Sequence, residues 1–167
     1  MQFDDPFSFE EEGFSGFVGV DELQQTNCAA APDVPGVYLV YRLLYSRHDF
    51  LPESVGGHYK GRNPTVSIAG LQRKWVENSV ALYIGKAGSL KGAATLRGRL
   101  RQYMSFGQGL PVAHWGGRYI WQLTDSASLR VCWKPIPDKV PREVEYQLIQ
   151  EFRKQNNGRL PFANLRN

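Results

Sequence analysis

Two apolar runs rich in β-branched and aromatic residues constrain the fold of this chain more than any other feature. DVPGVYLVYRLLY, residues 33–45, begins with a Pro-Gly turn, and VALYIGKA, residues 80–87, is followed by a glycine. Short runs of this composition between turn residues are typical of strands. The second run ends on Tyr83, Gly85 and Lys86, although tyrosine suits strands, and glycine and lysine suit their ends, without any further role. The sequence therefore predicts a sheet and directs attention to the end of the second strand.

Helical and hairpin patterns follow these strands. In ATLRGRLRQYM, Leu96, Leu100 and Tyr103 recur at helical spacing, and a final helix is predicted at about 141–155, with Pro141 at its start. IAGLQRKWVEN predicts a short helix, while GRYIWQL and SLRVCWKPI, separated by TDSA, predict an antiparallel hairpin. The expected fold class is α/β (α+β), with a small central, mainly antiparallel sheet flanked by helices.

The chain is expected to be one domain with two distinctive segments. Its 167 residues are enough to bury a core without a disulfide or a metal. Residues 1–30 mix acids with phenylalanines and have no clear helical or strand period, so we interpret them as an acidic N-terminal arm. Residues 31–167 are the domain proper, and residues 46–80, rich in glycine, proline and charge, are interpreted as a long inserted loop.

Charge is distributed unevenly along the chain. The net charge is +4, but residues 1–25 hold seven acids and no Lys or Arg, which leaves 20 bases against nine acids in residues 26–167. Such a body indicates a polyanionic partner, with nucleic acid first, although a basic surface kept for solubility is the alternative. The arm is expected either to lie across the basic face, where its acids imitate phosphates, or to pack through its aromatic rings.

Composition disfavours several classes of protein. Cys28 and Cys132 lie far apart without neighbours at ligand spacing, so neither a disulfide framework nor a zinc site is indicated. No apolar run approaches the length of a membrane span, and the acidic N-terminus lacks the apolar segment of a secretory signal, so we expect a cytoplasmic protein without a membrane partner. His48, His58 and His114 are isolated in the sequence and are assigned to surface loops, with a base role for His58 as the alternative.

Glu145 is anomalous in the pattern of the final helix. It shares one helical face with Leu148, Ile149 and Phe152. A carboxylate on an apolar stripe needs a partner, because an uncompensated buried charge is costly. Three explanations are open: the stripe reaches solvent at that end, Glu145 pairs with an arginine, or Glu145 holds a metal ion.

The order of these elements resembles that of the GIY-YIG nuclease superfamily. GVY at 36–38 matches the first family signature, and YIG at 83–85 matches the second. Lys86 follows directly, as in YVGKA of the excision-repair incision subunit, LRGRLRQY resembles its LKKRLSSY, and EYQLIQEF resembles its EALLLEH. The likeness covers residues 34–166 apart from the insertion, which puts 45 positions between the signature tyrosines and resembles insertions in restriction-enzyme members.

The resemblance implies a role for each matched residue. It assigns the catalytic arginine to Arg99, the metal-binding carboxylate to Glu145 and the asparagine that closes the family core to Asn164, and it puts Tyr103 where other branches carry a histidine. Because extra residues precede the arginine relative to the repair subunit, two neighbours remain alternatives: Arg97 and Arg101.

Hydrolysis of a phosphodiester fits these residue types. It needs an activated water, stabilisation of charge on the phosphoryl oxygens and help for the leaving 3′ oxygen. Tyr38 or Tyr83 is the expected general base, with Lys86 and a bound cation lowering its pKa, while Arg99 holds the phosphate. Glu145 is the expected ligand of a single Mg²⁺, with Mn²⁺ as an alternative. The residues expected to contact the substrate are Gly85, Tyr103, Arg97, Arg101, Lys60, Arg62 and Asn164.

The expected function is that of a Mg²⁺-dependent endonuclease acting on DNA, with duplex DNA first. The insertion, in which bases outnumber acids, is expected to contact the nucleic acid. Restriction, repair and mobile-element roles remain open, as do structured RNA as a substrate and the oligomeric state, with a dimer as one alternative. Two other functions remain alternatives: a nucleic-acid-binding module that keeps the fold without cutting, and a regulatory subunit that uses the acidic arm for a protein partner.

Overall fold

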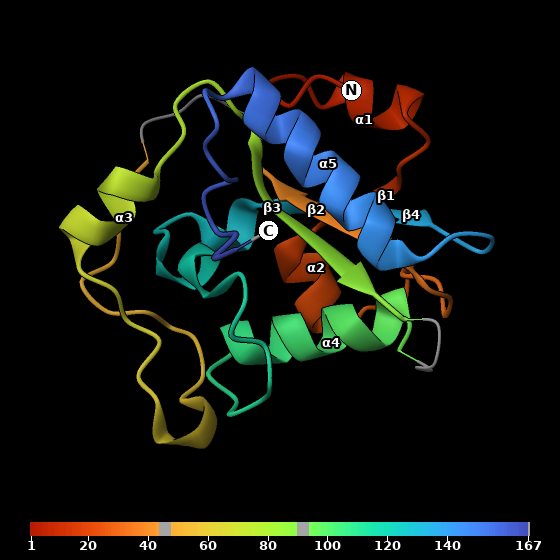
Figure 1. Ribbon diagram of the computed structural model, residues 1–167. Coiled ribbons are helices and arrows are strands. Elements are labelled where there is room, and N and C mark those ends of the chain that lie inside the picture. The colour runs from red at the N-terminus through yellow and green to blue at the C-terminus, as the bar shows by residue number, and fades with distance from the viewer. Residues whose placement is uncertain (44–47, 90–93, 167) are drawn as a thin grey trace.

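A computed structural model describes residues 1–43, 48–89 and 94–166 of the chain. The strands of this part form one antiparallel sheet in the order β1-β4-β2-β3, with helices packed against it (Figure 1). The expected α/β (α+β) class with a central antiparallel sheet is therefore confirmed. The strands are β1 (Ser15–Gly19), β2 (Gly36–Tyr41), β3 (Ala81–Ala87) and β4 (Arg130–Pro135).

The two longest helices begin at residues suited to a helix N-terminus. The Thr95 hydroxyl accepts a hydrogen bond from the Gly98 N–H (3.1 Å) at the start of α4, and Pro141 occupies the first turn of α5, where it lacks no needed donor. The helices predicted near 68–78, 94–104 and 141–155 are thereby confirmed. The α-helices are α1 (Phe7–Glu11), α2 (Val20–Gln25), α3 (Ile68–Lys74), α4 (Leu96–Gly107) and α5 (Pro141–Gln155), and short 3₁₀ turns occur at Tyr59–Gly61, Arg118–Gln122 and Ser126–Ser128.

The sheet is buried on both faces. Val37, Leu39 and Tyr41 of β2 pack in one apolar cluster with the inner residues of α5, while Tyr38 and Val40 pack in another with α2 and α4. Successive side chains of a strand point to opposite faces, so a strand covered on both sides must be apolar throughout. This arrangement explains why the run at 36–41 lacks polar alternation.

β3 lies at an edge of the sheet, and the C-terminal tail covers part of that edge. The Ala163 N–H donates to the Leu82 carbonyl (2.8 Å), and the Asn164 amide bonds both the N–H and the carbonyl of Ile84 (2.9 Å each). These bonds supply partners to backbone groups that an edge strand otherwise leaves open. Beyond Ile84 the described residues of the tail give the edge no such bonds, and Lys86 lines a cleft there.

The predicted hairpin at 117–136 is wrong in its first half. Residues Arg118–Gln122 form a 3₁₀ helix, and only Arg130–Pro135 form a strand. The physical reason is that β4 has no free side: β2 pairs with one edge of it and β1, from the N-terminal segment, pairs with the other. Ile120 and Trp121 are buried in the core from this 3₁₀ helix, so the apolar run reflects burial and not strand pairing.

The N-terminal segment contains regular structure that its pattern did not predict. Residues 1–30 hold α1, β1 and α2, and Phe3, Phe9 and Phe14 are buried in the core. Its acids are largely exposed, and Glu12 lies 4.0 Å from the Lys134 amine. Of the two expectations for this segment, packing through aromatic rings matches the contacts. The signal was missed because three short elements, each of five or six residues, are too brief to show a period.

The insertion at 46–80 packs over the core as a largely irregular segment that includes α3. Its first two residues, 46 and 47, lie outside the described residues. The Gln122 side chain fixes it by bonding the Val66 N–H (2.9 Å), the Val66 carbonyl (2.7 Å) and the Leu51 carbonyl (3.0 Å).

None of the helices in the described ranges has the length and apolar character needed to cross a bilayer.

Candidate active site

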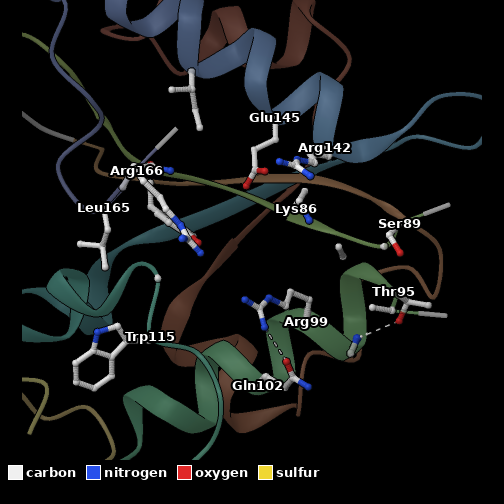
Figure 2. A pocket seen from close by; sticks show the side chains of 18 residues that line it. Lys86, Ser89, Thr95, Arg99, Gln102, Trp115, Arg142, Glu145, Leu165 and Arg166 are labelled. Carbon is white, nitrogen blue, oxygen red and sulfur yellow. Dashed lines mark hydrogen bonds between the residues drawn. The ribbon is translucent and has the colours of Figure 1, made fainter. Parts of the chain in front are cut away.

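A cleft of about 1230 Å³ opens at the uncovered end of β3, between the first turns of α4 and α5 (Figure 2). β3 supplies Tyr83 and Lys86, α4 supplies Arg99, and α5 supplies Glu145. Four residues named from sequence therefore meet in one concavity, although they lie up to 62 positions apart. The lining also includes Thr95, Gly98, Gln102, Trp115, Arg142, Asn164 and Arg166.

Glu145 is half-buried and directs its carboxylate into the cleft (Figure 2). Burial raises its pKa, and the charges of Lys86, Arg99 and Arg142 oppose that rise. None of these bases forms an ion pair with Glu145 within the described part of the chain. A direct pairing with arginine, one of the three explanations of this residue, is therefore absent from the described contacts. Its surroundings are cationic, and its oxygens remain open to a ligand.

Arg99 extends from α4 into the same space. One terminal nitrogen donates to the Gln102 side-chain oxygen (3.0 Å) and to the Ala113 carbonyl (3.4 Å), which orient the guanidinium across the cleft (Figure 2). The two alternative arginines point elsewhere: Arg97 bonds the Ala31 carbonyl (2.8 Å) and Arg101 bonds the Asn27 carbonyl (2.9 Å). Among the three arginines, Arg99 is the one that lines the cleft.

Two further bases of the cleft were missed from sequence. Arg142 and Arg166 line it together with Lys86 and Arg99, so four bases share the cleft with Glu145, and three of them, Lys86, Arg99 and Arg142, act on its carboxylate. Arg142 precedes Glu145 by three residues on the same helical face, a spacing that could have identified it. Arg166 follows Asn164 in the irregular tail, where no periodic signal exists.

The two signature tyrosines are not equivalent. Tyr83 lines the cleft and is 8% exposed, whereas Tyr38 is fully buried behind it, with the ring centroids 5.9 Å apart. Burial raises the pKa of Tyr83 to about 12, against a lowering by Arg99, and raises the pKa of Tyr38 well above its usual range. Both phenols therefore hold their protons at neutral pH. Arg99 is the cation that lowers the pKa of Tyr83. Lys86, which was expected to do this, lowers the pKa of Glu145 instead.

His114 is fully buried, so its assignment to a surface loop is wrong. Its Nε2 lies 3.1 Å from the Tyr38 hydroxyl, and its ring stacks on Tyr103 at 4.0 Å and 13°. Burial lowers the pKa of His114 to about 3, so the imidazole is neutral and can accept the Tyr38 proton in a hydrogen bond. The contact joins positions 76 residues apart, and no local pattern in the sequence predicts it.

Tyr103 and Gly85 lie beneath the cleft instead of lining it. The Tyr103 hydroxyl donates to the Gly117 carbonyl (2.8 Å) and is fully buried. Gly85 faces the Tyr38 ring, and a Cβ there would come within 2.4 Å of that ring. The structure therefore gives Gly85 a packing role, in contrast to the expected close approach of a phosphate.

Replacing Gly85 with alanine is expected to destabilise the fold, because Tyr38 is fully buried and its ring cannot move away from the new methyl group. Overpacking of this kind costs about 1–3 kcal/mol, or about 2–4 °C of melting temperature per kcal/mol in a chain of this size. Thermal unfolding followed by circular dichroism measures the loss. The loss should shrink when the same change is made in a Tyr38→Leu background, and an undiminished loss would contradict this explanation.

The insertion reaches the rim of the cleft through an aromatic contact. The Arg62 guanidinium lies 5.8 Å from the centre of the Trp115 ring system, and Arg118 lies 4.6 Å from it. Trp115 lines the cleft, whereas Lys60 is exposed beside Tyr59. Arg62 is therefore close to the candidate site, and Lys60 lies in the exposed part of the insertion.

The donor set suits a divalent cation that keeps most of its water. Glu145 is the carboxylate of the cleft lining, and the described residues contain no group of three or more His, Cys, Asp or Glu arranged to hold a metal. Mg²⁺ commonly uses one or two carboxylates together with water and substrate phosphate, so one carboxylate beside a phosphate site is compatible with it. Asn164 is unsuited as a ligand, because both its side-chain atoms bond Ile84.

Comparison of the chain with protein-family models, with curated proteins and with solved structures gave no match. The likeness to GIY-YIG nucleases consequently rests on the signatures and on the residues of the cleft. The matched residues that line it are Tyr83, Lys86, Arg99, Glu145 and Asn164.

Proposed function

We propose that the protein is a metal-dependent phosphodiesterase, and more specifically a Mg²⁺-dependent endonuclease of the GIY-YIG type that cuts duplex DNA. The observation that carries the proposal is that four bases, one carboxylate and one tyrosine line the same open cleft. Among the described contacts, the carboxylate of Glu145 forms no direct ion pair with these bases. The first turns of α4 and α5 also contribute lining residues, and helix N-termini attract anions. We further propose that it acts in the cytoplasm, in restriction or DNA repair.

Three bases of the cleft have a role in holding the substrate. Arg99 places two donors on the scissile phosphate, since a guanidinium fork matches phosphate oxygens, and Gln102 keeps that fork in position. Lys86 and Arg142 add positive charge beside Glu145. Glu145 would hold the Mg²⁺, which when bound supplies Lewis acidity at a phosphoryl oxygen. Such positioned charges stabilise the transition state more than the ground state, because negative charge grows on the phosphoryl oxygens.

Tyr83 is the better candidate for the residue that receives the proton of the attacking water. It lines the cleft, whereas Tyr38 is fully buried. Because burial raises its pKa to about 12, it must be lowered in the substrate complex, and Arg99 already acts in that direction. Tyr38 and His114 support the Tyr83 ring from behind and act as positioning residues.

Incubation of supercoiled plasmid with the pure protein tests the proposal. Nicked or linear DNA is expected with Mg²⁺ or Mn²⁺, and intact plasmid is expected when EDTA is present. Nicked DNA alone indicates a monomer that cuts one strand at a time, while direct conversion to linear DNA indicates a dimer. Plasmid that stays intact with either metal, at several salt concentrations, would count against an endonuclease.

A non-cleaving nucleic-acid-binding module is the second candidate. Two observations favour it: the cleft has one carboxylate, and both signature tyrosines have raised pKa values. A binding module keeps salt-dependent affinity for DNA and has no cleavage that EDTA can remove. The same plasmid experiment, followed by a binding titration, therefore separates the two functions.

Removing two bases of the insertion is expected to weaken DNA binding. The logarithm of DNA affinity falls linearly with the logarithm of salt concentration. In Lys60→Ala/Arg62→Ala, the slope of this line should become shallower by about 0.9 for each lost phosphate contact. Fluorescence anisotropy with a labelled duplex measures the slope. The matched control is Lys139→Ala/Lys154→Ala, which removes the same charge from exposed positions that do not line the cleft. Equal slopes for the two variants would make the insertion a structural cover.

A further inference from the structure

A second concavity, separate from the cleft, lies where α3 and α5 end. Its volume is about 380 Å³, and four of its lining residues are basic. We call it the basic pocket; its lining residues are Arg73, Lys74, Arg153, Gly158, Arg159 and Leu160. No carboxylate is among these lining residues, so the charge of the pocket is uniformly positive.

Backbone contacts account for only part of this concentration of charge. Arg153 donates through Nε to the Gly158 carbonyl (3.0 Å), and Arg159 donates through a terminal nitrogen to the Arg73 carbonyl (2.6 Å). Bases near helix C-termini are favourable, which explains these two bonds. Among the described residues, the side chains of Arg73 and Lys74 make no such bond, and none of the four bases forms an ion pair. The guanidinium and ammonium groups therefore keep donors for an external anion.

One face of α5 connects the basic pocket with the cleft. Arg142, Glu145 and Ile149 line the cleft and Arg153 lines the pocket, and spacings of three, four and four residues keep all of them on one stripe. Glu145 and Arg153 are eight positions apart, which spans about 12 Å at 1.5 Å per residue. A DNA strand advances about 3.4 Å for each base pair, so this span corresponds to about three or four base pairs.

We propose that the basic pocket binds a backbone phosphate of the DNA about three or four base pairs from the phosphate in the cleft. This inference rests on the proposed function, because it takes DNA as the ligand of the cleft. The pocket anchors the duplex on one side of the cleft and fixes which direction the strand runs along α5. It reads charge and spacing and not base sequence, since a contact to a backbone phosphate carries no sequence information.

The first test compares two variants that remove the same charge. Arg73→Gln/Lys74→Gln changes exposed side chains of the pocket, while Lys139→Gln/Lys154→Gln changes exposed lysines outside both concavities, one of them next to Arg153. Duplex affinity is measured without divalent metal at several salt concentrations. The slope of log affinity against log salt concentration should become shallower by about 0.9 for each lost phosphate contact in the first variant, and by less in the control. Equal slopes would overturn the proposal, as would a wild-type protein that fails to bind duplex at low salt.

The second test shortens the duplex on one side of the phosphate bound in the cleft. Wild-type affinity should fall once that flank drops below about four base pairs, whereas Arg73→Gln/Lys74→Gln should already be insensitive to the shortening. Binding without cleavage would reject the endonuclease but would leave these slopes and lengths in support of the pocket. ATP provides a free phosphate probe: a loss of ATP binding in the pocket variant, with an unchanged duplex slope, would assign the pocket to nucleotides and overturn the proposal.

Discussion

Glu145→Gln is expected to reduce Mg²⁺-dependent cleavage of DNA by about 10³-fold or more, while DNA binding is retained. A metal ion that polarises a phosphoryl oxygen contributes several kcal/mol, and each 1.36 kcal/mol is a factor of ten in rate. Glutamine keeps the size of the side chain and removes the charge that would hold the metal. Glu145 is the carboxylate of the cleft lining, so none of the other lining residues can take its place as an anionic ligand. Single-turnover cleavage of a labelled duplex measures the loss.

DNA affinity in this variant should stay equal or increase. Glu145 is surrounded by Lys86, Arg99 and Arg142, and removal of its negative charge makes the cleft more attractive to phosphate. Glu151→Gln is the matched control, because Glu151 lies on α5 in an exposed position outside the cleft. Cleavage at the wild-type rate by Glu145→Gln would remove the metal role from this residue. Loss of binding with unchanged unfolding temperature would make it a substrate contact instead.

Local patterns predicted the elements that are long or buried on both faces. The runs that became β2 and β3 were visible because a doubly covered strand is apolar throughout, and α4 and α5 are long enough to show a helical period. β1 was missed because its five residues are partly exposed and include Gly16 and Gly19. The false hairpin followed from the same gap: once β1 occupies the side of β4, residues Arg118–Gln122 have no strand to pair with.

The candidate site was predictable where a residue has a distinctive local position. Glu145 stood out as a carboxylate on an apolar stripe, and Lys86 as a base near the end of a buried strand. His114 had no such signal, because its burial depends on Tyr38 and Tyr103, which come from other parts of the chain. Sequence likewise left the two signature tyrosines equivalent. Tyr38 lies on the central strand β2 and is buried, whereas Tyr83 lies on the edge strand β3 and lines the cleft.

Tyr83→Phe is expected to slow cleavage by about 10²–10⁴-fold, the usual loss when a general acid or base is removed. Tyr83 borders the cleft, so phenylalanine removes the hydroxyl proposed to receive the proton of the attacking water and keeps the ring that packs between Tyr38 and Tyr103. The effect on stability should be small. Single-turnover rates at saturating Mg²⁺ and thermal unfolding of the same preparation measure the two quantities side by side.

Tyr38→Phe provides the comparison. It is expected to lower stability more than Tyr83→Phe does and to slow cleavage less. Its hydroxyl lies 3.1 Å from Nε2 of the buried His114, and deleting it leaves that nitrogen without its partner. A buried polar atom left unpaired costs about 1–3 kcal/mol, so the melting temperature should fall more than in Tyr83→Phe. Cleavage should fall less, because Tyr38 reaches the substrate only through Tyr83. The reverse pattern, with an inactive Tyr38→Phe and an active Tyr83→Phe, would assign the proton-accepting role to Tyr38.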